Sequence, residues 1–332
     1  MGIKSNLLAS AYYNFFGATG KDTEAIPPPP PMSASGGTEI IDGSYTYHVY
    51  VSDSTFVVTD SPGTIEAIVI GGGGGARGDW PGGGGAGGVA HAESWPMTPG
   101  TYPVVIGDGG AASPISSGDG SANKGADTTF NGITGLGGGA GTQDAYQGPL
   151  PFSAPNLNGG SGGGNGDEPV GPTTAAGTGT QPTEPTHGGL VTNYGNPGFA
   201  PAGGNTWPAT TQNNGGGGGA GGGGTDGLTT GPTGGAGQPF TNFPGPLIAP
   251  AIPGVPNWAI NVGPTGLYGG GGGASGDGSG GGGDPGPGGG GRGGPSGFAG
   301  LNYTGGGGGG QNGNSPGGYD GGKGVVIIRR LT

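Results

Sequence analysis

The sequence predicts an all-β protein: an antiparallel β-sandwich-like scaffold with a bundle of polyglycine II helices and long loops. Of its 332 residues, 98 are Gly and 33 are Pro. Because Gly costs about 1 kcal/mol and Pro about 3 kcal/mol per helical position, long helices are excluded from most of the chain. Alternating apolar segments bracket the glycine-rich part. Charged residues make up only 8% of the chain, whereas disordered chains are usually highly charged, so we expect order.

Apolar alternation predicts the first strands. Residues 44–51 alternate strictly, and a turn at 52–54 leads into a returning strand at 55–58. Residues 65–70 become apolar on both faces, which is typical of a central strand. Further strands are expected at 89–94, 101–106, 128–130 and 133–136, and Pro103 predicts an edge position for 101–106.

The chain ends in Val325-Val326-Ile327-Ile328, which is apolar on both faces and is expected to lie buried in the middle of a sheet. The chain would then return to its start, so 38–332 is interpreted as one glycine-rich β domain without helices. Within it, 141–268 is expected to be a loop-rich insertion, because Pro, Thr, Asn and Gln are common there. Residues 269–332 are expected to form a polyglycine segment and the closing strand.

The glycine runs predict the bundle. A glycine run can adopt an extended three-fold helix that has no internal hydrogen bonds, so its N–H and C=O groups must find partners on neighbours. Without Cβ atoms, such helices can approach one another on every side. No fixed period links the runs, which excludes a solenoid. The runs are 71–75, 82–85, 215–219, 221–224, 269–273, 280–283, 288–291 and 305–310.

Residues 1–26 form a separate block, expected to be a short helix or an extended arm. The block is too short to build its own core, so we interpret it as a segment that docks onto another protein; a strap over the chain's own domain is the alternative. Residues 27–37 form a proline-rich spacer, which begins with five consecutive prolines and is stiff for that reason. The expected docking residues are Leu8, Tyr12, Tyr13, Phe15 and Phe16.

Composition and motif context exclude several functions. The chain has no Cys, and therefore no disulfide and no thiolate metal site. Its net charge of −12 disfavours nucleic acid, and no apolar run is long enough for membrane insertion. A Gly-x-Ser-x-Gly motif at 159–163 lacks the strand and helix of a nucleophile elbow. His48, His91 and His187 are far apart and are interpreted as structural. We expect no enzymatic activity and no cofactor.

Four segments carry a family resemblance: 63–75 (GTIEAIVIGGGGG), 82–89 (GGGGAGGV), 98–107 (TPGTYPVVIG) and 321–328 (GGKGVVII). In this order they resemble the glycine-rich domain of bacteriophage tail-fibre and adhesin proteins, over about 38–140 and 305–332. The block Ala11-Tyr12-Tyr13-Asn14-Phe15-Phe16-Gly17 also looks like the N-terminus of virion structural proteins of marine cyanobacterial phages. The resemblance implies a protein of the extracellular virion, with a β-sheet scaffold, polyglycine II helices and binding to a host-surface glycan or protein.

We therefore expect a phage virion structural protein, a fibre or adhesin, whose N-terminus binds other virion structural proteins. A homotrimer would be common for a fibre, although no heptads enforce it. The alternatives are a capsid or tail decoration protein with an assembly role only, and a cell-made extracellular filament subunit. Isolated aromatic residues predict receptor contacts, although core packing is the favoured interpretation for any single one. The candidates are Tyr194, Trp207, Phe243 and Trp258.

Overall fold

The protein is described here from a computed structural model. The chain divides into two compact units, Met1–Pro30 and Pro31–Thr332, and all described residues belong to the second unit. The described residues are 31–78, 81–113, 122–142, 156–166, 175–200, 214–226, 231–276, 282–311 and 317–332.

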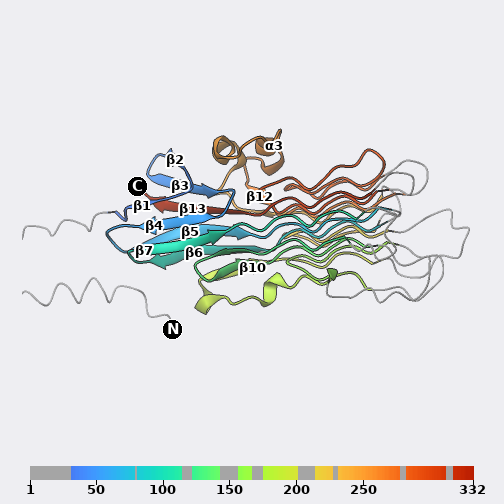
Figure 1. Cartoon of the computed structure of the whole chain (residues 1–332), viewed down its shortest axis with the longest axis horizontal. Helices are drawn as coiled ribbons and strands as arrows, with labels where there is room; N and C mark the ends of the chain where they lie inside the picture. Colours follow the sequence, from blue (N-terminus) through green and yellow to red (C-terminus); the bar gives the residue numbers. More distant parts are fainter. Residues whose placement is uncertain are drawn as a thin grey trace, which may run out of the picture. The chain divides into compact units, whose positions relative to one another are not determined.

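Two antiparallel sheets form the β scaffold (Figure 1), which confirms the all-β class. A six-stranded sheet has the order β10-β6-β5-β13-β3-β2, and a five-stranded sheet has the order β1-β4-β7-β8-β9. The six-stranded sheet contains β2 (Thr38–Asp42), β3 (Tyr45–Tyr50), β5 (Gly63–Ile70), β6 (Val89–Met97), β10 (Val191–Tyr194) and β13 (Val325–Leu331). The five-stranded sheet contains β1 (Ala34–Ser35), β4 (Ser54–Val58), β7 (Gly100–Val105), β8 (Thr128–Phe130) and β9 (Ile133–Gly135).

The closing strand β13 lies between β3 and β5, in the middle of the six-stranded sheet. Residues 325–328 are fully buried, as their apolar pattern on both faces predicts. The end of the chain therefore returns to its first strands. Ala34 and Ser35, which the sequence places in the spacer, pair with β4, so the folded unit begins before residue 38.

Two strand placements differ from the sequence prediction. The strand β4 does not return along β3, because β3 already has β2 and β13 on its two sides; β4 instead joins the other sheet. The strand β7 is not an edge strand, since it pairs with both β4 and β8. Pro103 is tolerated there because β8 pairs only with Val104 and Val105, so Pro103 lies beside the end of β8.

The six-stranded sheet is covered on both faces by apolar residues. One cluster, with Phe56 and Phe130, fills the space between the two sheets. The second cluster covers the opposite face and includes Phe243 and Trp258, from the chain between the short strands β11 (Gln238–Pro239) and β12 (Leu267–Tyr268).

The prediction that the domain has no helix is wrong. The second apolar cluster contains α2 (Gly245–Ile248), η4 (Ala249–Ala251) and α3 (Trp258–Val262). Two more single turns, η2 (Gln181–Thr183) and η3 (His187–Gly189), come just before β10. The helices form because residues 247–262 concentrate aliphatic side chains that are buried against the sheet, and this burial outweighs the poor helix propensity of the prolines.

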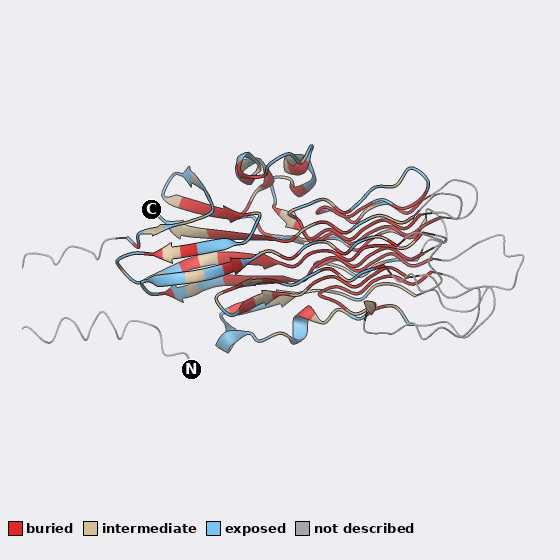
Figure 2. Ribbon diagram, in the orientation of Figure 1, coloured by how far each residue is buried: buried red, intermediate tan, exposed pale blue. Residues whose placement is uncertain are grey.

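Beyond the strands, the glycine-rich segments run side by side and are buried along most of their length (Figure 2). Within 71–76 the amide donors rotate through three neighbours, so that every third residue donates to the same segment. The three neighbouring segments are 85–88, 123–126 and 319–322. A lateral hydrogen-bond pattern with a period of three is the signature of an extended three-fold helix, so the predicted bundle is present.

The polyglycine bundle comprises the laterally bonded runs around 71–76, 82–88, 215–220, 270–274 and 305–310, with the segments beside them. A Cβ atom on any glycine of 71–75 would lie less than 3.0 Å from the backbone of a neighbouring segment. None of these glycines has a positive φ, so they are required for close approach and not for a special backbone conformation. Residues 141–268 are expected from the sequence to be a loop-rich insertion. They supply bundle segments and helices as well as loops.

Candidate functional site

Two of the predicted receptor contacts are core residues. Phe243 is 0% exposed and Trp258 is 2% exposed, both in the apolar cluster on the outer face of the six-stranded sheet. The ring of Trp258 lies 6.0 Å from that of Tyr268, and the ring of Phe243 lies 6.3 Å from that of Tyr47. Because neither ring has an exposed face, the structure gives both a packing role, and receptor contact through them is ruled out.

The other predicted site residues are placed differently. Tyr194 is half-buried at the end of β10 and lines a pocket. Trp207 lies outside the described residues. The expected docking residues also lie outside them: Leu8, Tyr12, Tyr13, Phe15 and Phe16.

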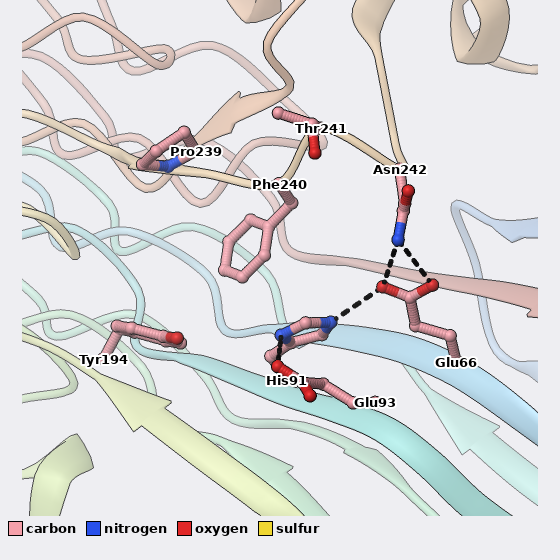
Figure 3. A pocket seen from close by; sticks show the side chains of 8 residues that line it. All are labelled: Glu66, His91, Glu93, Tyr194, Pro239, Phe240, Thr241 and Asn242. Atoms are coloured by element: carbon pink, nitrogen blue, oxygen red, sulfur yellow. Dashed lines mark hydrogen bonds and ion pairs between the residues drawn. The ribbon is translucent and has the colours of Figure 1, made fainter.

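The pocket beside Tyr194 lies on the outer face of the six-stranded sheet and has a volume of about 510 Å³ (Figure 3). Its floor comes from β5 and β6, one wall from β10, and the other from β11 and the chain that follows it. The lining residues are Glu66, His91, Glu93, Tyr194, Pro239, Phe240, Thr241 and Asn242. We call this the Glu66 pocket.

Glu66 is the most connected side chain of the pocket. Its carboxylate accepts hydrogen bonds from His91 Nε2 at 3.0 Å and from Asn242 Nδ2 at 3.1 and 3.0 Å. The third donor is Arg329 Nη1 at 3.1 Å, from the directly opposite position on β13. The guanidinium of Arg329 also packs 3.9 Å from the centre of the Tyr45 ring. These four bonds use the whole acceptor capacity of a carboxylate.

Local strand geometry positions Glu66. The register between β5 and β6 shifts between Ile65 and Ala67, which is the irregularity of a β-bulge. Two residues of β6, Glu93 and Ser94, oppose Glu66 alone, so the extra residue lies in β6. Glu66 itself follows the regular alternation of β5, in which Ile65 and Ala67 face the cluster between the sheets and Ile68 faces the outer cluster. The carboxylate therefore points to the outer face, where it meets β13 and the chain after β11.

The electrostatics of the pocket favour an ionised Glu66. Burial alone would raise the pKa of this carboxyl, but the hydrogen bonds from His91 and Asn242 and the charge of Arg329 hold its pKa below the ordinary value. An ionised carboxylate only accepts hydrogen bonds, so His91 Nε2 carries the hydrogen of their bond. The other ring nitrogen, Nδ1, lies 4.0 Å from Glu93 Oε1 and faces the pocket.

His48 has a different, structural role on the opposite face of the same sheet. Its Nδ1 donates to the carbonyl oxygen of Gly36 at 2.9 Å, and its Nε2 accepts from Arg330 Nε at 3.1 Å. Burial lowers the pKa of His48, which favours this neutral form. Within the described ranges no group of three or more His, Asp or Glu side chains is arranged to hold a metal ion.

Sequence reasoning missed Glu66, His91 and Asn242 as a site. One signal was available: Glu66 is a lone carboxylate inside the apolar strand 63–70, and a charge in such a strand needs a partner. Its partners could not be found from spacing, because Asn242 and Arg329 come from distant parts of the chain. The motif at 159–163 is no catalytic elbow, since the Ser161 amide donates to the Ala86 carbonyl inside the polyglycine bundle.

Comparisons with known proteins identify the domain. In the part of the chain that the structure describes, no helix has the length and apolar character needed to cross a bilayer. No curated protein matches the chain. A family model described as a glycine-rich domain matches residues 50–330, which is most of the chain. The match begins at the last residue of β3 and ends inside β13. It takes in most strands of both sheets, the polyglycine bundle and the Glu66 pocket, but not β1 or β2. The chain is a member of this glycine-rich domain family.

Proposed function

We propose that this chain is a phage virion structural protein, a fibre or adhesin, that displays its glycine-rich domain and binds a host-surface receptor. The resemblance of the strand and glycine segments to tail-fibre and adhesin domains supports the proposal. The chain's membership of the glycine-rich domain family agrees with the part of this resemblance that concerns the domain itself. The N-terminal block and the proline spacer would attach the domain to other virion proteins.

One structural observation carries the proposal: the described segments end together at the end of the polyglycine bundle away from the strands. The Gly78 amide donates to Ser113 at 3.1 Å, and the Gly166 amide donates to Thr142 at 2.8 Å. Binding residues are often carried by chain segments that a rigid scaffold positions. Trp207 lies outside the described residues and stays an expected contact.

The test compares particles that carry the full chain with particles produced with a chain lacking residues 1–30. We expect the shortened protein to be absent from purified particles, measured by immunoblotting, while it accumulates as soluble domain. The particles without it are expected to adsorb more slowly to host cells. Full occupancy by the shortened protein would overturn the docking role.

The same test separates the alternatives. Loss of the protein with unchanged adsorption would indicate a decoration protein with an assembly role only. Filaments formed by the purified full chain, seen by negative-stain microscopy, would indicate an extracellular filament subunit instead. Wild-type particles that contain no copy of the protein by mass spectrometry would overturn the proposal as a whole.

A further inference from the structure

We propose that the Glu66 pocket is a binding site for a neutral saccharide, such as a hexopyranose unit of a larger glycan. The biological role of this site rests on the proposed receptor function, but the binding itself does not.

The floor of the pocket is electrically neutral and rigid. Glu66 is saturated by its four hydrogen bonds, and Arg329 balances its charge from 3.1 Å away. The side chains of Glu66 and Arg329 are only 15% and 14% exposed, so the pair is fixed in place. Glu66 therefore has no acceptor capacity left for a ligand and serves to hold the ring of His91.

Besides the hydroxyl of Thr241, three polar groups lie on the open side. Because His91 Nε2 is bonded to Glu66, Nδ1 is the ring nitrogen that His91 presents to the open side of the pocket. The Glu93 carboxylate is 76% exposed and adds acceptor oxygens at 4.0 Å from Nδ1. Burial, together with the charge of Glu93, raises the pKa of Tyr194, so its hydroxyl keeps its proton and can donate.

Two apolar surfaces frame these groups. Phe240 is 5% exposed and holds the ring of Tyr194 edge-on at a centroid distance of 5.6 Å. Phe240 also contacts the ring of His91 at 5.0 Å in the same edge-on manner. The half-buried ring of Tyr194 and the exposed ring of Pro239 are thus left to contact a ligand. The rest of the exposed lining is mostly polar, which suits a ligand that carries several hydroxyl groups.

This chemistry matches a sugar better than a cation or an anion. A pyranose offers an apolar C–H face for the rings and several hydroxyl groups that both donate and accept. An ammonium group would depend on Glu93, the one carboxylate of the pocket without a balancing cation, and an exposed ion pair contributes little. An anionic sugar would be repelled by the same Glu93. The volume of about 510 Å³ lies within the usual range of ligand pockets, roughly 300–1,000 Å³.

The test is isothermal titration of the purified full chain with three probes: methyl α-glucopyranoside, methyl β-galactopyranoside and methyl α-mannopyranoside. We expect at least one to bind with a Kd on the order of 1 mM, as is usual for one sugar unit with few contacts. N-acetyl-lysine methylamide serves as the cationic probe. Binding of the lysine probe alone, or of none of the four probes, would overturn the inference.

A matched pair of variants locates the binding. Glu93→Ala should weaken binding of the glycoside at least about tenfold, the loss expected for one charge-assisted hydrogen bond. Glu39→Ala is the control, because Glu39 is also an exposed strand glutamate beside a histidine, 3.7 Å from His48 Nδ1, but outside the pocket. Equal weakening by both variants, or no weakening by Glu93→Ala, would place the binding elsewhere and overturn the inference.

Particle adsorption separates this inference from the proposed function. If Glu93→Ala abolishes glycoside binding and also slows adsorption to host cells, both are supported. If it abolishes glycoside binding but leaves adsorption unchanged, the saccharide site is supported and its role as the receptor contact is overturned. If the protein is absent from particles while the purified chain binds glycosides, the proposed function alone fails.

Discussion

The amide of Gly84 donates to the carbonyl oxygen of Gly308 at 2.8 Å, which joins two glycine runs that are far apart in the sequence. The carbonyl oxygen of Gly84 in turn accepts the amide of Gly272 at 2.9 Å. One glycine therefore bonds two distant segments, and the bundle continues the β scaffold without any side-chain layer. The apolar core of the domain is confined to the sheets and their helical cover.

Removing the charge of Glu66 should destabilise the domain. Glu66→Gln leaves Arg329 without its ion-pair partner in a largely buried position, for which we expect a loss of about 3 kcal/mol in the free energy of unfolding at pH 7. Chemical denaturation measures this loss. Glu39→Gln, an exposed carboxylate of the same sheet, is the control and should stay within about 0.5 kcal/mol of wild type.

The pH dependence of the same pair follows from the lowered pKa of Glu66. A carboxyl whose folded pKa is depressed stabilises the protein above its unfolded pKa, and this stabilisation is lost as the pH falls through the folded value. The deficit of Glu66→Gln relative to wild type should therefore shrink in acid, below a pH of about 4. A deficit that stays constant from pH 7 to pH 3 would contradict the assignment of an ionised Glu66.

His48 should make stability fall between neutral and mildly acidic pH. Its folded pKa is lowered by burial, so the unfolded chain binds the proton first. The stability contribution is complete above the unfolded pKa of about 6.5 and is lost progressively as the pH falls from there toward the folded value. We expect His48→Gln to flatten the unfolding free energy between pH 7.5 and 5.5, measured by denaturation at about half-unit steps.

The control for His48 is His187→Gln, since His187 is an exposed residue at a turn. This variant should keep the wild-type slope with pH. If the slope disappears in the His187 variant and persists in the His48 variant, the assignment of the pH dependence to His48 is wrong.

The aromatic residues of the helical cover should act on stability. Trp258→Ala removes a 2%-exposed ring from the second apolar cluster, so we expect a loss of about 3–5 kcal/mol in a thermal or chemical unfolding experiment. Ile260→Ala on the same helix removes a side chain that is 78% exposed and should stay within about 0.5 kcal/mol of wild type. Comparable stability of the two variants would mean that the helical cover does not pack as described.

Much of the scaffold could be predicted from the sequence because its signals are local. The alternation at 44–51 and the apolar pattern of 325–328 each specify a strand and its burial within a few residues. The glycine runs specify close lateral packing for two reasons. Without Cβ atoms, neighbouring segments can approach closely, and the backbone N–H and C=O groups of an extended run need hydrogen-bond partners on those neighbours. The choice of sheet was not local: β4 leaves β3 only because β13, from the far end of the chain, occupies that side of β3.

The candidate site could not be predicted because, like the choice of sheet, it depends on contacts between segments that are distant in the sequence. The pocket exists only after β5, β6, β10 and the chain beyond β11 have come together, and no spacing motif records that assembly. Tyr194 and Trp258 are both isolated aromatic residues in the segment 141–268, yet Tyr194 lines the pocket whereas Trp258 is buried. Local composition alone does not distinguish an aromatic residue that packs in the core from one that lines a pocket.

The most direct test of the bundle as a scaffold compares two Gly→Ala variants within one glycine-rich segment. A Cβ at Gly217 would lie less than 3.0 Å from the Gly84 backbone, whereas the nearest atom to a Cβ at Gly222 is 3.7 Å away. Neither glycine has a positive φ, so neither substitution strains the backbone by itself. The measurement is the free energy of unfolding of the full chain. We predict that Gly217→Ala loses at least about 3 kcal/mol or fails to fold, while Gly222→Ala is unchanged or gains up to about 1 kcal/mol. Equal stability of the two variants would contradict the close-packed bundle.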